Sequence, residues 1–455
     1  KQGSWFNKGT SDNSATVKSQ IEAGTTTNAA FTGVTGRLTP SFVRQTSNNT
    51  INVNFGQDAS FAGTESSATK TDENGIGAFQ YDVPSGFLAL CSSNLPDPTI
   101  GPQTSTQADD HFNTLLYSGD GNDDRAISGV GFQPDWVWIK NRSNAGNDHI
   151  LTDSSRGGDL PLNSNGNYSE STQTNKLESF ASDGFVLGQS VHSSVNANSN
   201  TYVAWNWKAN GGTLTTNDAS ATGVGTIDSQ YQANTTAGFS IVTYTGTGSE
   251  GTVAHGLSSA PEVLFIKNRT DARSWVVGHV SGGFTGQYTL NTDGAFSTNA
   301  GSFNDTAPTS TVVNVNTDQT TNESGDSMVM YCLHSVEGYS KFGKFVGNNL
   351  LDGPFIYTGF RPAWILAKRS DSTSDWFLLD NKRSPENVVG GGGVGQLAAN
   401  QTYVESALST YAIVDFMSNG FKMRSDMNYG YWNASGGTYI YLAFAEQPFK
   451  FSNAR

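Results

Sequence analysis

The segment DGNDD, residues Asp120 to Asp124, holds the clearest group of possible metal ligands in the chain. Asp120, Asn122 and Asp124 offer side-chain oxygens at alternate positions, as the first part of a calcium-binding loop does. The bidentate acid that normally completes such a loop is missing, and Asp-Gly-Asn is equally typical of a hairpin turn. These three residues are therefore a calcium candidate with an ordinary turn as the alternative, and we predict no other cofactor.

No other pattern in the sequence forms a recognisable catalytic site. The six histidines include no HxH or HExxH pair that would indicate zinc. The run GGGGVG, Gly390 to Gly395, lacks the Lys-Ser/Thr ending of a phosphate-binding loop and is predicted to be a surface loop. Glycan hydrolysis would need two facing carboxylates, and the acidic residues lie scattered on turns, although a pair from distant strands would leave no motif. We predict that the chain is not an enzyme.

An aspartate and an arginine three residues apart occur twice, in DHILTDSSRGG and in DWFLLDNKRSP. A carboxylate and a guanidinium at this spacing can join a strand to the turn that follows it, and a ligand-binding role is the alternative. We predict the structural role. The related segment SWVVGHVSGG lacks both residues, so any site that they formed would be missing there. The two pairs are Asp153 with Arg156 and Asp380 with Arg383.

Four tryptophans in Trp-x-Trp pairs could stack on sugar rings if they were exposed. On a central strand, however, such a pair more often fills a hydrophobic core, and we predict that role for Trp136, Trp138, Trp205 and Trp207. Glycan recognition would then use the loops at the ends of the domains, for which the sequence gives no residues.

The strands that carry these residues repeat three times. The copies are GFQPDWVWIKNR, LSSAPEVLFIKNR and GFRPAWILAKR, and a proline opens each strand at Pro134, Pro261 and Pro362. Period-two alternation puts Val137 and Ile139 on one face and the tryptophans on the other. Both faces are apolar, which predicts a central strand in a β-sandwich.

Two further segments recur in the same order. Asp-Gly in SFASDGFVLG and Asn-Gly in DFMSNGFKMR, each between apolar runs, predict hairpins at 179–188 and 415–424. Each copy closes on an alternating strand, TYVAWNWKAN, SMVMYCLHSV or TYIYLAFAEQ. Several short strands with turn signals at this spacing are typical of a sandwich.

The composition agrees with an all-β chain of several domains. Charged residues make up only 15% of the 455 residues, and 51 glycines with many Ser, Thr and Asn residues favour short strands and tight turns. We predict tandem antiparallel β-sandwich domains of the jelly-roll or concanavalin-like kind. The expected boundaries are a partial sandwich at 1–91, a linker at 92–110, repeat 1 at 111–210, a linker at 211–236, repeat 2 at 237–337 and repeat 3 at 338–455.

Charge, hydropathy and cysteine content exclude some partners. A formal net charge of −14 repels a phosphate backbone, so we predict no nucleic-acid binding. No apolar run approaches the length of a membrane span, so we predict no membrane insertion. Cys91 and Cys332 fall in different predicted domains, and we expect two reduced thiols rather than a disulfide, in a chain assembled in a reducing cytosol.

Near the N-terminus the chain resembles the C-terminal part of a SPRY domain. The similar segments are GSWFNKG (Gly3 to Gly9), LTPSFV (Leu38 to Val43), INVNFGQ (Ile51 to Gln57) and the following VPSGFLALCSSNLPDPTI (Val83 to Ile100). A complete domain of this kind needs a longer segment before GSWFNKG, so the resemblance implies a truncated or proteolysed chain, or one whose N-terminal portion is not included.

The three repeats resemble domains of tail-fibre-like virion proteins of marine and cyanobacterial tailed phages, with laminin-G-like or concanavalin-like folds. This resemblance implies a tail-fibre or capsid-fibre protein on the virion surface that acts in host attachment or as a spacer. The implied partners are other virion proteins, further copies of the chain in a homotrimer, and a host surface glycan. A capsid decoration protein and a glycan-cleaving tail spike are the alternatives.

Overall fold

The computed structural model describes residues 55–60, 63, 70–94, 98–101, 104–189, 193–385, 387, 395–407, 414–424 and 432–448. It divides the chain into two compact units, Lys1–Asp97 and Pro98–Arg455. The predicted all-β class is confirmed, since antiparallel strands dominate and the described helices are single short turns. The described residues contain no helix long and apolar enough to cross a membrane.

The first unit is described from residue 55 onward. An isolated bridge joins Lys70 to Phe79, and Asp72 accepts backbone N–H groups from Ile76 and Ala89 at 2.9 and 2.8 Å. A short helix, η1 (Ser92–Asn94), follows. The SPRY-like segments that end before residue 55 lie outside the described residues.

Repeat 1 is a sandwich of a large and a small sheet. The hairpin predicted at 179–188 is present, and Val137 and Ile139 pack with Leu187 between the two sheets. The large sheet has the order β1-β8-β3-β4-β5 and the small sheet β2-β7-β6, with the strands β1 (Phe112–Ser118), β2 (Arg125–Ser128), β3 (Trp136–Asn141), β4 (Ile150–Asp153), β5 (Gly157–Leu162), β6 (Leu177–Ala181), β7 (Gly184–Leu187) and β8 (Thr201–Trp207). The strand with the Trp-x-Trp pair is therefore central, as predicted.

Repeat 2 has the same core strands in an eight-stranded sheet, β16-β15-β14-β13-β18-β11-β10-β9, covered by the pair β12-β17 and short helices. Its elements are β9 (Thr215–Asn217), α2 (Ala219–Thr222), β10 (Ser229–Asn234), β11 (Phe239–Thr245), β12 (Gly251–Ala254), β13 (Val263–Asn268), β14 (Val276–His279), η3 (Val280–Gly282), β15 (Gly286–Thr289), β16 (Ser297–Thr298), α3 (Ala300–Phe303), β17 (Val312–Val315), α4 (Gln319–Asn322) and β18 (Ser327–Leu333). Here α3 and α4 lie in the part of the chain that lacks the Asp-Gly hairpin.

The linker predicted at 211–236 is instead part of the sheet of repeat 2. Its strands β9 and β10 pair in register, and β10 pairs with β11. The segment shows no apolar alternation because the fully buried position of β10 is filled by Gln232, which is hydrogen-bonded rather than apolar. The end of the linker predicted at 92–110 also packs on the second unit, through buried Ile100 and Ala108, the latter in η2 (Ala108–Asp110).

Repeat 3 again combines a large and a small sheet. The large sheet is β19-β27-β21-β22-β23-β24 and the small sheet is β20-β26-β25, which includes the hairpin predicted at 415–424. The strands are β19 (Ser340–Val346), β20 (Phe355–Tyr357), β21 (Phe360–Arg369), β22 (Trp376–Asp380), β23 (Gly395–Ala398), β24 (Ser406–Ala407), β25 (Val414–Met417), β26 (Gly420–Met423) and β27 (Thr438–Pro448). Pro362 lies at a register shift inside β21 rather than before the strand.

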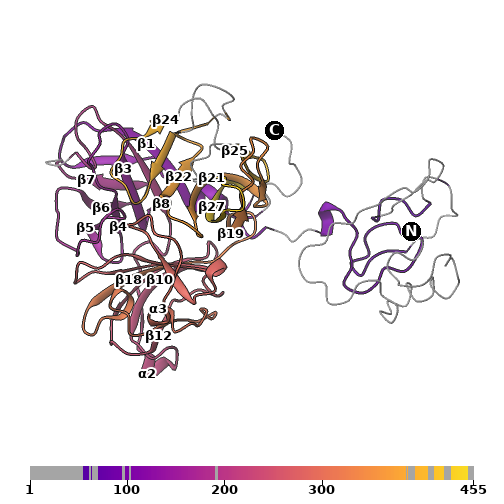
Figure 1. Cartoon of the computed structure of the whole chain (residues 1–455), viewed down its shortest axis with the longest axis horizontal. Coiled ribbons are helices and arrows are strands. Elements are labelled where there is room, and N and C mark those ends of the chain that lie inside the picture. The colour runs from indigo at the N-terminus through magenta and orange to yellow at the C-terminus, as the bar shows by residue number, and fades with distance from the viewer. Residues whose placement is uncertain are drawn as a thin grey trace. The chain divides into compact units, whose positions relative to one another are not determined.

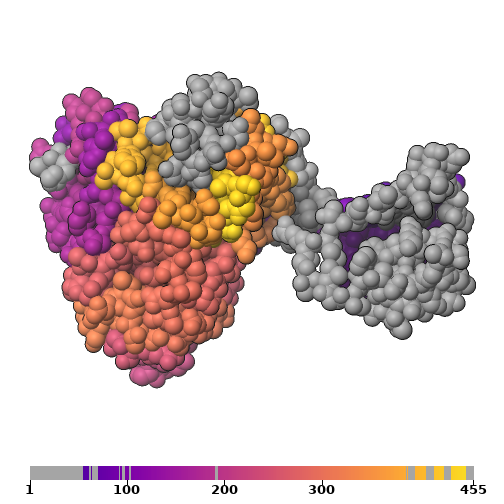
Figure 2. All heavy atoms as spheres, in the orientation of Figure 1, coloured from indigo at the N-terminus to yellow at the C-terminus, as the bar shows by residue number. Residues whose placement is uncertain are grey.

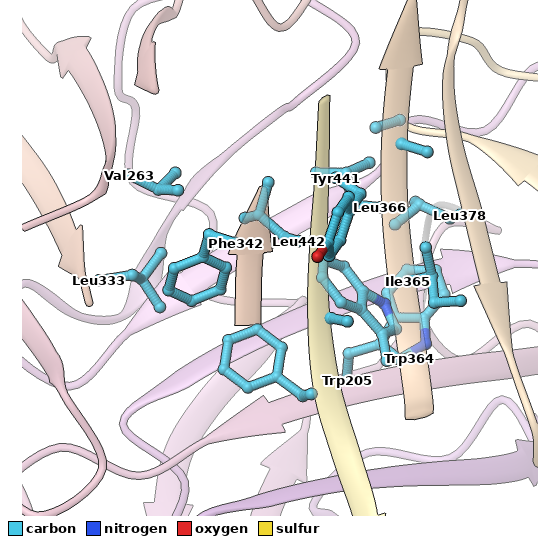
Figure 3. Packing of buried hydrophobic residues seen from close by; sticks show 14 of the residues in the cluster. Trp205, Val263, Leu333, Phe342, Trp364, Ile365, Leu366, Leu378, Tyr441 and Leu442 are labelled. Carbon is cyan, nitrogen blue, oxygen red and sulfur yellow. The ribbon is translucent and has the colours of Figure 1, made fainter. Parts of the chain in front are cut away.

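The three repeats share one hydrophobic core. They occupy adjacent sectors of the second unit (Figures 1 and 2), and one cluster of buried side chains, the shared core, draws on the large sheets of all three (Figure 3). Trp136 stacks on Tyr331 of repeat 2 with ring centroids 4.4 Å apart, and Trp207 meets Trp364 of repeat 3 edge to face. The tryptophans are buried as predicted, but they fill the space between repeats rather than the interior of one sandwich.

Candidate functional site

The first Asp/Arg pair lies at the contact between repeats 1 and 2, which we call seam 1–2. Arg156 Nε donates to Asp153 Oδ2 at 2.6 Å, and both side chains are fully buried. Asp153 Oδ2 also accepts the hydroxyl of Tyr331 from repeat 2 at 2.6 Å. Glu170 then bridges Arg156 to Arg269 of repeat 2, at 2.5 and 2.7 Å. The predicted structural role of this pair thus extends to joining two repeats.

The second pair has the equivalent place at seam 3–1, between repeats 3 and 1. Arg383 Nε donates to Asp380 Oδ2 at 2.5 Å, again with both side chains fully buried. The same carboxylate oxygen accepts the indole N–H of Trp205 at 3.0 Å, and the guanidinium lies 5.6 Å from the centre of the Trp205 ring. Trp205 and Tyr331 hold the same position of their sheets, opposite Trp138 and Phe265.

Seam 2–3, between repeats 2 and 3, has neither charged partner. The register of β14 puts His279 where the other repeats carry the aspartate, and the register of β27 puts Leu442 where they carry Trp205 and Tyr331. His279 Nδ1 accepts the N–H of Ser281, and burial lowers the pKa of the ring to about 4. Repeat 2 thus lacks the aspartate of the Asp/Arg pair, and the facing sheet of repeat 3 lacks the aromatic residue that donates a hydrogen bond to this aspartate in the other seams.

A second set of contacts closes the three repeats into a ring, and the sequence did not reveal it. At the start of each of β4, β14 and β22, an aromatic ring nitrogen contacts a backbone carbonyl of a neighbouring repeat; the ring belongs to the residue just before β4 and β14 and to the first residue of β22. The pairs are His149 Nε2 with Ala398 O at 2.9 Å, Trp275 Nε1 with Asn163 O at 2.8 Å, and Trp376 Nε1 with Thr289 O at 3.0 Å. Three asparagines accept the backbone N–H groups of these residues, namely Asn165, Asn291 and Asn400.

The lysines that end the three repeated strands are also structural. Lys140, Lys267 and Lys368 are buried, and each Nζ donates to a backbone carbonyl at 2.6, 2.5 and 2.6 Å, respectively that of Asn147, of Asn268 and of Arg369. Burial lowers the pKa of each of these lysines to about 8. They satisfy backbone carbonyls inside the protein and do not form a basic surface.

The calcium candidate lies on the loop between β1 and β2. Asp120 Oδ1 accepts the N–H of Asn122 at 2.9 Å and pairs with Arg125 at 3.2 Å, so a cation of the protein already contacts this carboxylate. Asp124 has a positive φ of 53°, as in a tight turn. The described residues contain no group of three His, Cys, Asp or Glu side chains that could hold a metal ion. Calcium binding by these residues stays a prediction.

A cleft of about 300 Å³ lies at seam 3–1. Its floor is buried and includes Phe112 and Thr114 of β1 and Asn381 of the turn after β22. Its more accessible rim carries polar and charged groups, namely Gln107, Asp109, Asn113, Lys382 and Glu446. Thr114 Oγ1 and Asn381 Oδ1 are buried and have no hydrogen-bond partner within the part of the chain that the structure describes. Sequence reasoning missed this cleft, whose floor joins residues far apart in the chain.

The fold and these contacts define a single all-β unit of three fused sandwiches. Residues 107–448 match the family described as "Domain of unknown function (DUF7483)", and the chain belongs to this family. The match covers all three repeats together, as the shared core does. No curated protein matches the sequence.

Proposed function

We propose that this chain is a non-enzymatic structural protein on the virion surface of a tailed bacteriophage, where the three-repeat unit is a rigid body of a tail fibre or capsid fibre. The observation that carries this proposal is the ring of buried contacts between repeats. A body whose domains share one core transmits force and holds a fixed geometry, which a spacer or attachment module requires.

The chemistry of the seams supports a structural rather than a catalytic role. The Asp153–Arg156 and Asp380–Arg383 pairs are fully buried and are used in joining repeats. Buried ion pairs of this kind favour one packing arrangement over others, because misplacing either charge leaves it unpaired in an apolar environment.

The phage assignment rests on the resemblance of the repeated segments to tail-fibre-like proteins. On that basis the partners would be other virion proteins, two further copies of the chain in a homotrimer, and a glycan of the host surface. An acidic, glycine-rich and hydroxyl-rich β-protein suits an exposed particle surface, because a net charge far from zero, −14 here, favours solubility.

Antibody labelling of purified particles in negative-stain electron microscopy tests the location. Label on the tail or on capsid fibres is expected, label over the capsid shell would favour a decoration protein, and particles without the protein would contradict the proposal. Limited proteolysis of the same chain tests rigidity. Cleavage near residue 97, between the two units, should leave the three repeats together, whereas early cuts within 211–236 would contradict one rigid body.

A further inference from the structure

The cleft at seam 3–1 differs from the same place in the other two seams, because no side chain among the described residues satisfies the buried oxygens of Thr114 and Asn381. At seam 1–2, Gln232 of β10 fills this place. Its Nε2 donates to Ser154 and Ser155 at 2.8 and 2.6 Å, and its Oε1 accepts the N–H of Gly212 at 3.0 Å. One side-chain carboxamide thereby satisfies groups from both sides of the seam.

The register of the sheets makes the two places directly comparable. Gln232 lies beside Ile241 of β11, and Ile241 holds the position that Thr114 holds in β1, since the two face Tyr331 and Trp205. Asn381 follows Asp380 as Ser154 follows Asp153. Thr114 and Asn381 therefore flank a place in seam 3–1 that is equivalent to the one occupied by the Gln232 carboxamide in seam 1–2.

At seam 2–3 the protein again supplies its own polar group. Ser335 accepts the N–H of Phe342 at 3.1 Å and donates to the carboxylate of Glu262. Glu262 precedes β13 as Ala363, in the floor of the cleft, precedes Trp364 in β21. At seams 1–2 and 2–3 a side chain of the protein occupies this particular place, whereas at seam 3–1 the hydroxyl of Thr114 and the amide oxygen of Asn381 have no hydrogen-bond partner among the described residues.

We propose that this cleft binds the acetamido group of an N-acetylated sugar. An acetamido N–H can donate to Asn381 Oδ1, and its carbonyl can accept the hydroxyl of Thr114, so that the ligand supplies what Gln232 supplies at seam 1–2. Phe112 and Ala445 give the floor apolar surface for the methyl group.

The size and the rim of the cleft favour a sugar over an isolated amide. A volume of about 300 Å³ is far larger than one amide group and is at the lower end of the range of small-molecule sites. Asp109, Asn113 and Gln107 on the rim offer acceptors for sugar hydroxyls. The inference deepens the proposed function, because it gives the virion module a site for a host glycan.

Saturation-transfer difference NMR on the whole chain tests this site, with N-acetylglucosamine as the probe and glucose as the matched sugar without the acetamido group. We expect transfer to the acetyl methyl group and much weaker transfer to glucose. The isosteric variant Thr114→Val and the variant Asn381→Leu should each weaken binding about five- to tenfold, as expected for one hydrogen bond. Thr215→Val, on the exposed strand β9, is the control and should bind as the unmodified protein does.

Stability separates loss of the site from loss of the fold. Because the Thr114 hydroxyl is buried and has no partner in the described ranges, Thr114→Val should leave the melting temperature unchanged or raise it. Equal transfer to both sugars, no transfer to either, or full binding by Thr114→Val would overturn the proposal. If acetyl-glutamine amide bound and N-acetylglucosamine did not, the sugar proposal would be overturned in favour of a peptide ligand. Each result is independent of particle labelling, so this site and the virion location can fail separately.

Discussion

Replacing Tyr331 by phenylalanine tests whether a contact at one seam stabilises the whole second unit. The Tyr331 hydroxyl donates to Asp153 Oδ2 at 2.6 Å, and its ring stacks on Trp136. Phenylalanine keeps the stacked ring and removes only the hydroxyl. The substitution therefore removes the bond to Asp153 together with a longer one between repeats 1 and 2, at 3.4 Å, that Arg156 Nη2 donates to the same hydroxyl.

The expected cost follows from the groups that remain. A hydrogen bond to a charged group contributes about 1.5–3 kcal/mol to stability. Asp153 keeps its contact with Arg156, so the carboxylate is not left unpaired, and we expect about 2 kcal/mol. With an unfolding entropy of about 2.1 cal/mol/K per residue, a cooperative unit of about 350 residues should then lose roughly 2–3 °C in Tm.

Differential scanning calorimetry measures this change, and near-ultraviolet circular dichroism follows the aromatic core during the same transition. Tyr403→Phe is the control, since Tyr403 is 62% exposed, and it should leave Tm unchanged. A transition that splits in two in the Tyr331→Phe variant would show that the repeats unfold separately. That result, or an unchanged Tm, would refute cooperative coupling through the shared core.

Three further predictions follow from buried groups. Burial lowers the pKa of His279 from 6.5 to about 4. Its neutral ring therefore stabilises the folded state above pH 6.5, and this contribution is lost as the pH falls toward 4. In the His279→Asn variant, Tm should fall less between these two pH values than in the unmodified protein. Asp380→Ala should cost about 3–5 kcal/mol in urea denaturation because it leaves Arg383 without its main buried partner, and the variant with both residues replaced by alanine should lose less than the sum of the single changes. Burial raises the pKa of the Cys332 thiol. A thiol reagent should therefore modify only the half-buried Cys91 in the native chain, and both thiols in denaturant. Rapid modification of both thiols in the native chain would contradict the packing of repeat 2.

The sequence was informative where apolar residues alternate. Period-two patterns predicted the central strand β3 and the two faces on which Val137 and Trp136 lie, and Asp-Gly and Asn-Gly predicted both hairpins. The same pattern cannot say what covers the second apolar face. A strand with two buried faces looks alike whether its outer face meets another sheet of its own domain or a different repeat.

Polar contacts at the seams were harder to predict because their partners are far apart in the chain. Gln232 made β10 resemble a linker, since a buried amide gives no apolar signal. The floor of the cleft combines Thr114 with Asn381, and neither residue belongs to a motif. The residue types at equivalent positions of the three repeats do differ at this place, but these positions can be aligned only when the register of the sheets is known.

The union of three sandwiches in one polypeptide has a consequence for how such a protein can diversify. In a symmetric assembly of identical subunits, one substitution appears at every interface at once, so a change that opens one contact weakens them all. Here each interface is encoded by its own residues. The chain has tyrosine with aspartate at one junction and tryptophan with aspartate at another, and at the third the equivalent positions hold leucine and histidine. The residues of one junction can therefore change to suit a different ligand, while the contacts at the other two junctions continue to hold the three repeats together.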